Sequence, residues 1–211
     1  LPFEEEIYEK AGIPCEFVGH PVMEEIEQYE KSAPAPTAAQ GKSGIESPII
    51  ALLPGSRPSE LRSLLPVFSD FVKKAKAELS GCRFIIPLAP NLDPERFAEA
   101  LALLESEGVE VVRGETTRVL KSSDMAVVAS GTATLQTALL GVPMVVVYRL
   151  SPVTFAIARR MIDVKHISLA NIVAGREVVP ELIQREADGE NIMKYARKIL
   201  CDEDYRASMV S

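Results

Sequence analysis

The chain has 211 residues, of which 47% are hydrophobic and 25% are charged, and Asp and Glu outnumber Lys and Arg by 30 to 23. These proportions are typical of a folded globular chain with a sizeable core, and they exclude disorder over most of the length. The net charge of −7 excludes the positive field that nonspecific nucleic-acid binding requires, so no nucleic-acid partner is expected. At roughly 150 residues per domain, the length predicts one to two domains.

The cysteines and histidines are too few and too widely spaced for a zinc site, so no metal site is predicted. Cys15, Cys82 and Cys201 are expected to be small buried hydrophobes in a reduced, cytoplasmic compartment. His20 and His166 have no obvious partner in the sequence. Both are expected in loops or in packing, and neither is expected to act as a catalytic base.

The first residues predict a short helix over 3–11 that stops at Gly12, followed by an extended CEFV run at 15–18. A helix and one strand cannot bury a core alone. Residues 1–20 are therefore expected to be the tail of an amino-terminal domain whose body is missing from the sequence.

The next segment, 21–48, is interpreted as a crossover and linker, because residues 32–48 are rich in Ala, Pro, Ser and Gly and lack an apolar period. The linker contains Gly41-Lys42-Ser43, which is the end of a phosphate-loop motif. Pro36 stands where that motif requires glycine, and no strand leads into it. A nucleotide-binding loop is therefore not predicted there.

From residue 49 onward, short apolar runs typical of strands buried on both faces alternate with helical periods. The predicted strands are 49–53, 83–88, 109–112, 125–129 and 144–148. The predicted helices between them cover 61–79 with a kink at Pro66, a segment that opens at Asp93 and Pro94, and 132–141. This alternation predicts an α/β fold, a doubly wound, Rossmann-like parallel sheet with helices on both faces, over 49–190.

Helices are expected to dominate the chain from about Pro152. A helix at 191–200 opens the last segment, 191–211, which is interpreted as a carboxy-terminal helix that is truncated. The charge-free stretch 125–148 is long enough to cross a bilayer, but polar residues, Gly and Pro interrupt it. It is therefore interpreted as strand, loop, helix, loop and strand.

Two loops at predicted strand ends are candidates for ligand binding, because doubly wound sheets bind ligands outside the carboxyl ends of their strands. In the first loop, Gly55 allows close approach of a ligand, Ser56 offers a hydroxyl and Arg57 offers donors suited to phosphate. The alternative is a simple turn with a surface arginine.

The second loop lies between a predicted strand and a helix, where free amides form an anion site. Its residues are Ser130, Gly131, Thr132 and Thr134, and Gln136 follows within reach of a sugar hydroxyl. The alternative is a strand–helix turn with a hydroxyl cap. Because no GxGxxG motif is present, an ordinary dinucleotide fold is disfavoured.

Four motifs in order, together with the opening segment, resemble the lipid-A-disaccharide synthase family over nearly the whole chain. They read LLPGSRPSELRSLLPVF, IIPLAPN, SDMAVVASGTATLQTALLGVPMVVVYR and HISLANIVAGREVVPELIQ, and the opening reads LPFEEEIYEKAGIPCEFVGHP. The family is a glycosyltransferase of the two-Rossmann-domain type, GT-B. The resemblance implies that this chain is its carboxy-terminal, UDP-binding half.

The resemblance also implies a reaction in lipid A biosynthesis. The family transfers 2,3-diacylglucosamine from its UDP carrier to the 6-hydroxyl of 2,3-diacylglucosamine 1-phosphate, with inversion. UDP-diacylglucosamine is then a substrate, and no cofactor or metal is expected. The general base belongs to the missing amino-terminal half, so the chain alone should not turn over. The acylated substrates imply peripheral contact with the cytoplasmic face of the inner membrane, and a homodimer is left open.

The resemblance assigns roles to individual residues. Arg57 would stabilise the leaving diphosphate, which Gly55, Ser56, Ser130, Gly131, Thr132 and Thr134 would surround. Gln136 stands where the family usually has Glu and would contact the ribose. Asn171, Arg176 and Glu177 would line the cleft. The alternatives are a helix-cap or loop role for Asn171 and a surface ion pair for Arg176 and Glu177.

Other readings stay open at this point. One is a peptidoglycan glycosyltransferase or a UDP-sugar 2-epimerase, which share a Gly-x-Pro strand entry like 141–143. Another is a non-catalytic nucleotide-sugar-binding module that needs a partner chain. Residues 152–165, PVTFAIARRMIDVK, are interpreted either as a basic helix that contacts an anionic leaflet or as a core helix whose arginines face water.

Overall fold

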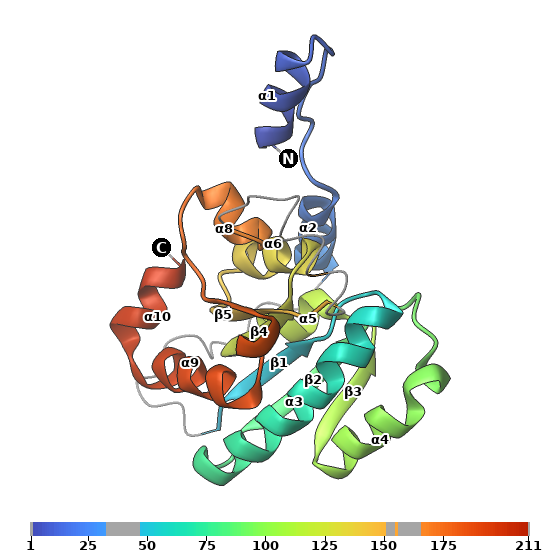
Figure 1. Ribbon diagram of the computed structural model, residues 1–211, viewed down its shortest axis with the longest axis vertical. Coiled ribbons are helices and arrows are strands. Elements are labelled where there is room, and N and C mark those ends of the chain that lie inside the picture. The colour runs from blue at the N-terminus through green and yellow to red at the C-terminus, as the bar shows by residue number, and fades with distance from the viewer. Residues whose placement is uncertain (1, 33–46, 151–154, 156–165, 211) are drawn as a thin grey trace.

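The computed structural model describes residues 2–32, 47–150, 155 and 166–210. Six strands form one parallel sheet in the order β3-β2-β1-β4-β5-β6 (Figure 1). The strands are β1 (Ile49–Leu53), β2 (Arg83–Leu88), β3 (Val109–Arg113), β4 (Met125–Ala129), β5 (Met144–Tyr148) and β6 (Glu181–Ile183). The doubly wound parallel sheet predicted from the sequence is confirmed.

The structure adds β6 to the five strands that were predicted, within the region after Pro152 where helices were expected to dominate. β6 has three residues, and its exposure alternates between half-buried and buried. A strand this short, with Glu181 as its first residue, lacks the continuous apolar run that marks a strand buried on both faces.

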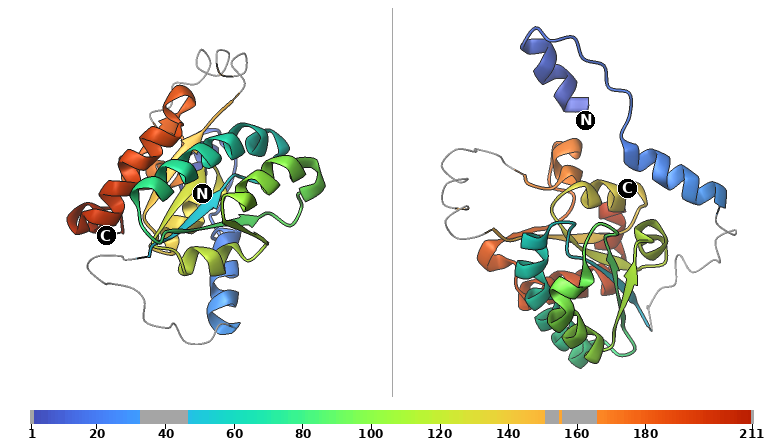
Figure 2. Two further views of the ribbon diagram at one scale, coloured as in Figure 1. Left: turned by 90° about the horizontal axis from the view of Figure 1, so that it is seen from below. Right: turned by 90° about the vertical axis from the view of Figure 1, so that its right-hand side faces the viewer.

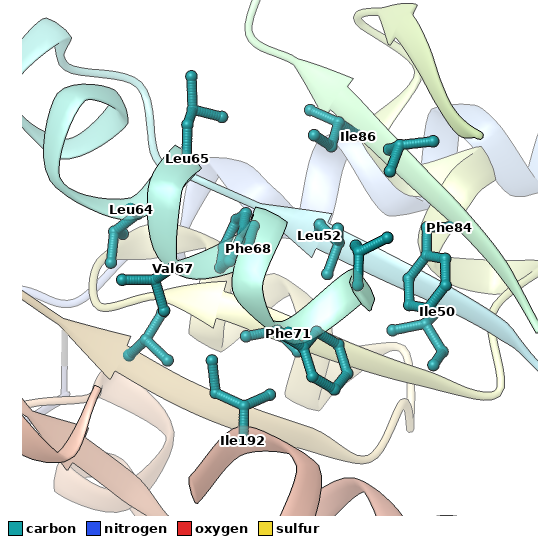
Figure 3. Close-up of a cluster of buried hydrophobic side chains, with 14 of the residues drawn as sticks. Ile50, Leu52, Leu64, Leu65, Val67, Phe68, Phe71, Phe84, Ile86 and Ile192 are labelled. Atoms are coloured by element: carbon teal, nitrogen blue, oxygen red, sulfur yellow. The ribbon is translucent and has the colours of Figure 1, made fainter. Parts of the chain in front are cut away.

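One face of the sheet is covered by α3 (Pro58–Glu78), α4 (Ala98–Ser106) and α9 (Gly189–Cys201). Their apolar sides pack on the side chains that the central strands present on this face, as Figure 3 shows for Phe68 and Phe71 of α3 and Ile192 of α9. The rings of Phe71 and Phe84 meet edge to face with centroids 5.9 Å apart. α3 continues as one helix through Pro66, and the short 3-10 turn η1 (Pro94–Phe97) precedes α4.

The opposite face is covered by α5 (Thr116–Lys121), α6 (Thr132–Leu139) and α8 (Leu169–Ala174). Alternate residues of β1 divide between the two layers, since Ala51 and Leu53 face this side while Ile50 and Leu52 face α3. The left view of Figure 2 shows the two helical layers on either side of the sheet.

The amino-terminal residues form two helices. α1 (Pro2–Lys10) confirms the predicted helix and stands away from the sheet (Figures 1 and 2). Residues 13–20 form no strand, and Val18 in the CEFV run is 89% exposed. α2 (Pro21–Ser32) lies within the predicted crossover, buries Val22 and Ile26, and contacts α5 and α6. Residues 33–46 of the predicted linker lie outside the described residues.

The carboxy-terminal segment contains two helices where one was predicted. α9 begins at Gly189, and α10 (Glu203–Val210) packs against it. The short 3-10 turn η2 (Gln184–Glu186) joins β6 to α9. No helix in the described part of the chain is long and apolar enough to cross a membrane, and 125–148 forms β4, α6 and β5 as predicted.

The cysteines differ from the expectation that all three are buried. Cys82 is buried, whereas Cys15 and Cys201 are exposed. Cys15 lies in the extended segment before α2, and Cys201 is the last residue of α9, where its side chain is outside the apolar face. Burial raises the pKa of the Cys82 thiol above its ordinary value.

Candidate nucleotide-sugar site

The two candidate loops leave the sheet side by side. β1 and β4 are parallel neighbours with Leu53 opposite Val128, so the loops that follow them start at the same edge. The strand order reverses between β1 and β4, since β2 and β3 lie on one side and β5 and β6 on the other. Doubly wound sheets place their ligand crevice at this point. The predicted juxtaposition of the two loops is therefore present.

The first loop is organised around Glu60, a residue that the sequence analysis did not single out. The backbone N–H groups of Ser56 and Arg57 donate to Glu60 Oε2 at 3.0 Å and 3.2 Å. Arg57 Nη1 donates to Glu60 Oε1 at 2.9 Å. The Arg57 side chain is 76% exposed and that of Glu60 only 15%. The structure thus leaves the arginine open to solvent and encloses the carboxylate.

Gly55 is required by this arrangement. Its φ is +95°, and a Cβ atom added there would overlap with Glu60 Oε2. The group that approaches Gly55 closely is therefore the carboxylate of Glu60. The sequence carried half of a signal for this contact, because Glu60 stands at N3, where the carboxylate of a capping box accepts the N–H of the N-cap residue. The N-cap residue Arg57 has no side-chain acceptor to complete the motif.

The second loop is tied to the segment before α8. Ser130 Oγ donates to the carbonyl of Ile167 at 2.7 Å. Thr134 is fully buried, and its hydroxyl donates to the carbonyl of Gly131 at 2.8 Å and accepts from the N–H of Leu169 at 3.2 Å. Gly131 and Thr132 are exposed at the start of α6. Of the residues predicted here, Gly131 and Thr132 are thus the ones open to a ligand.

Gln136 lies at the junction of α6, α5 and α2. It is buried, and its Nε2 donates to Thr117 Oγ1 at 3.0 Å and to Glu25 Oε2 at 3.3 Å. Both donor hydrogens of the amide are used within the protein. Its contact with a ribose stays a prediction.

Asn171 is the centre of a buried network that joins α8 to β6. Its Nδ2 donates to the carbonyl of Val179 at 2.9 Å and to Glu181 Oε1 at 2.8 Å. Its Oδ1 accepts from the N–H groups of Val178 and Val179 at 2.8 Å and 3.0 Å. An asparagine side chain has two donors and two acceptor sites, and all four are occupied. This arrangement favours the structural alternative for Asn171 over a contact with ligand.

Glu181 holds the same segment from the other side and was not singled out from the sequence. Its carboxylate accepts from the N–H of Ile167 at 3.0 Å, and from the N–H and hydroxyl of Ser168 at 2.9 Å and 2.8 Å. Ile167 in turn accepts from Ser130. A continuous chain of hydrogen bonds therefore links β6 to the loop after β4.

The remaining candidates lie outside this network. Arg176 and Glu177 are exposed in the turn after α8, and the described residues show no ion pair between them. His20 is a loop residue whose Nδ1 accepts the N–H of Val22 at 3.2 Å. His166 is half-buried, and its Nε2 has no hydrogen-bond partner among the described residues.

Solved structures share the fold of this chain. A UDP-GlcNAc 2-epimerase from Neisseria meningitidis, bound to UDP-GlcNAc, matches 90% of this chain and 44% of its own with a TM-score of 0.54 and 16% identity. A spinosyn rhamnosyltransferase complexed with thymidine diphosphate matches 84% of this chain and 43% of its own with a TM-score of 0.50 and 18% identity. The chain has the Rossmann-like fold of GT-B glycosyltransferases and related epimerases.

Sequence comparison identifies the family. The family model for lipid-A-disaccharide synthetase matches residues 1–210, and the chain belongs to that family. It is 39% identical to the lipid-A-disaccharide synthase of Anaeromyxobacter dehalogenans strain 2CP-C over all of this chain and 54% of that protein. It is 42% identical to the Myxococcus xanthus enzyme over 94% of this chain and 51% of that protein. The chain thus spans about half the length of these relatives.

Proposed function

We propose that this chain is the donor-binding half of a glycosyltransferase that transfers 2,3-diacylglucosamine from UDP to 2,3-diacylglucosamine 1-phosphate. The observation that carries the proposal is the family match over 1–210, which includes both loops at the β1–β4 strand ends. The amino-terminal half that the relatives possess would bind the acceptor and supply the general base.

The geometry suggests how this half contributes. As the acceptor 6-hydroxyl attacks the anomeric carbon, its proton passes to the base and the bond to the β-phosphate breaks, so negative charge gathers on the departing UDP. The exposed Arg57 and the exposed start of α6 at Gly131 and Thr132 lie at the same sheet edge. A guanidinium and helix N-terminal amides are suited to this charge. Together they would stabilise the leaving group without a metal ion.

The proposal is tested by calorimetry with UDP and by a product assay on the full-length protein. We expect UDP to bind equally well with EDTA and with magnesium, and the lipid disaccharide to form from the two acylated sugars. Binding that vanishes with EDTA and returns with magnesium would contradict the metal-free site. Epimerisation of a UDP-sugar, without disaccharide, would favour the 2-epimerase alternative.

We also propose peripheral contact with the cytoplasmic face of the inner membrane, because the substrates are acylated. The segment suggested for it, 152–165, lies outside the described residues apart from Phe155. Changing Arg159 and Arg160 to Ser should weaken sedimentation with anionic vesicles at low salt and leave UDP affinity intact, because each basic residue adds about 1 kcal/mol near such a surface. Unchanged sedimentation of the double variant would place the membrane contact elsewhere. Sedimentation of the full-length protein without vesicles would measure its mass and so test for a homodimer.

A further inference from the structure

The loop after β1 already holds an anion of its own. Glu60 Oε2 accepts both the Ser56 and Arg57 amides, and Glu60 Oε1 accepts Arg57 Nη1. Two adjacent amides and one guanidinium edge are the donors that a phosphate group takes in a loop of this kind. The carboxylate and a phosphate would therefore use the same three donors.

The enclosure of Glu60 shows that this contact is built into the fold. Its side chain is only 15% exposed, and the lack of a side chain at Gly55 leaves the space that Oε2 fills. Asn91 Nδ2 also donates to the Ser56 carbonyl, at 3.4 Å, so the loop after β2 contacts this turn. Among the described residues, the carboxylate of Glu60 is the partner that the structure shows for the guanidinium of Arg57.

We infer that Glu60 is an internal competitor of the diphosphate and sets the affinity of the site for UDP. The inference rests on the proposed function and deepens it. UDP binding would exchange the Glu60 carboxylate for phosphate oxygens at Arg57 and at the loop amides. When the sugar has been transferred, the carboxylate would take these donors again and favour the release of UDP.

Competition and simple capping predict opposite signs for one substitution. In Glu60→Gln, the side-chain oxygen can still accept from the two backbone amides, so the turn keeps its partners. The NH₂ group would replace Oε1 opposite Arg57 and could not accept from it, so the guanidinium is released. Competition predicts tighter binding of UDP. If Glu60 only shapes the loop, the substitution should disturb the loop and weaken binding, or leave it unchanged.

The experiment is calorimetry on the full-length protein with UDP and with uridine, which lacks the phosphates. We expect Glu60→Gln to bind UDP at least about threefold more tightly, because the phosphate no longer has to displace a charged hydrogen bond. Uridine affinity should stay within about twofold, because the inferred competition acts only on phosphate. The matched control is Glu99→Gln, an exposed residue on α4, which makes the same change in net charge and should leave both affinities unchanged.

Several outcomes would overturn the inference. One is that Glu60→Gln binds UDP no more tightly than the parent does. Another is that its affinity for uridine changes by the same factor as its affinity for UDP. A third is that the Glu99→Gln control gains as much affinity for UDP as Glu60→Gln does. If Glu60→Gln does not fold, Glu60→Asp keeps the charge and withdraws it by one methylene, and it must also bind UDP more tightly. A parent protein that binds uridine and UDP equally weakly would instead contradict the proposed function itself.

Discussion

Arg57 offers one edge of its guanidinium to Glu60 and leaves most of the side chain in solvent. A charged hydrogen bond to a phosphate that gathers charge contributes more in the transition state than in the ground state. We expect Arg57→Ala to lower kcat by roughly 10–100-fold, from a bond of about 1.5–3 kcal/mol, and to weaken UDP binding by less. Turnover and calorimetry on the full-length protein measure the two effects.

The matched control for this prediction is Arg62→Ala, because Arg62 is exposed on the same helix. It should change neither quantity. Equal losses of rate and of UDP affinity in Arg57→Ala would mean that the arginine only holds the donor.

For Asn171 the prediction concerns stability, since its four hydrogen bonds lie inside the protein. Asn171→Ala leaves two backbone N–H groups and a carbonyl without their buried partner. We expect a loss of about 1–3 kcal/mol of folding free energy, seen as a lower denaturation midpoint. If the variant keeps its stability and loses UDP affinity, the residue contacts ligand as the resemblance implies.

The residues of the candidate site were only partly predictable from the sequence. Strand-end reasoning located Gly55, Ser56 and Arg57 because the loop directly follows a recognisable buried strand. The strand pattern did not identify Glu60 as their partner. The assignment of Asn171 to the cleft came from the family resemblance and stays a prediction. The hydrogen-bond partners of a side chain depend on tertiary contacts, such as those of Asn171 with Val178 and Glu181. Composition and periodicity do not specify these contacts.

At the scale of whole elements, the buried strands were predicted accurately from the sequence, whereas short or largely exposed helices were not. Four of the five strands predicted from residues 49–148 are buried along nearly their whole length, and their sequences are apolar runs that the structure reproduces within one residue. The fifth, β3, lies at the edge of the sheet and carries the exposed Glu110. α2 and α5 were missed for the opposite reason. α2 buries only Val22 and Ile26 among many charges, and α5 is six residues long. Neither pattern is long or apolar enough to indicate a helix by itself.

The contact between α3 and α9 depends on Gly189. Its N–H donates to Asp70 Oδ2 at 3.1 Å, and an added Cβ would lie 2.7 Å from the backbone nitrogen of Phe71. We expect Gly189→Ala to destabilise the protein by about 1–3 kcal/mol, because overpacking outweighs the better helix propensity of alanine. Chemical denaturation should show a lower midpoint with an unchanged slope.

Glu190→Ala is the control for this variant, since Glu190 is the exposed neighbour on the same helix turn. Its midpoint should stay close to that of the parent. A stability of Gly189→Ala equal to that of the parent would mean that α9 can move away from α3 without cost.

At the scale of the whole molecule, the apolar surface is concentrated in the segment that precedes the sheet. Ile7, Tyr8, Ile13, Phe17 and Val18 are exposed, and α1 stands apart from the layers that bury the core (Figures 1 and 2). Soluble proteins seldom expose a group of large apolar side chains without a partner. Because the relatives are about twice as long, we expect an amino-terminal half to cover this segment in the full-length protein.

The three cysteines provide a test of this expectation, because they lie in three different environments. Cys15 is exposed within the apolar segment, Cys201 is exposed on α9, and Cys82 is buried with a raised thiol pKa. In the 211-residue chain, a maleimide reagent should modify Cys15 and Cys201 rapidly and Cys82 slowly, since the thiolate is the reactive form. In the full-length protein, modification of Cys15 should slow by at least about tenfold, because access would require local opening. Cys201 should keep its rate, and an unchanged rate at Cys15 as well would show that the amino-terminal half leaves this segment uncovered.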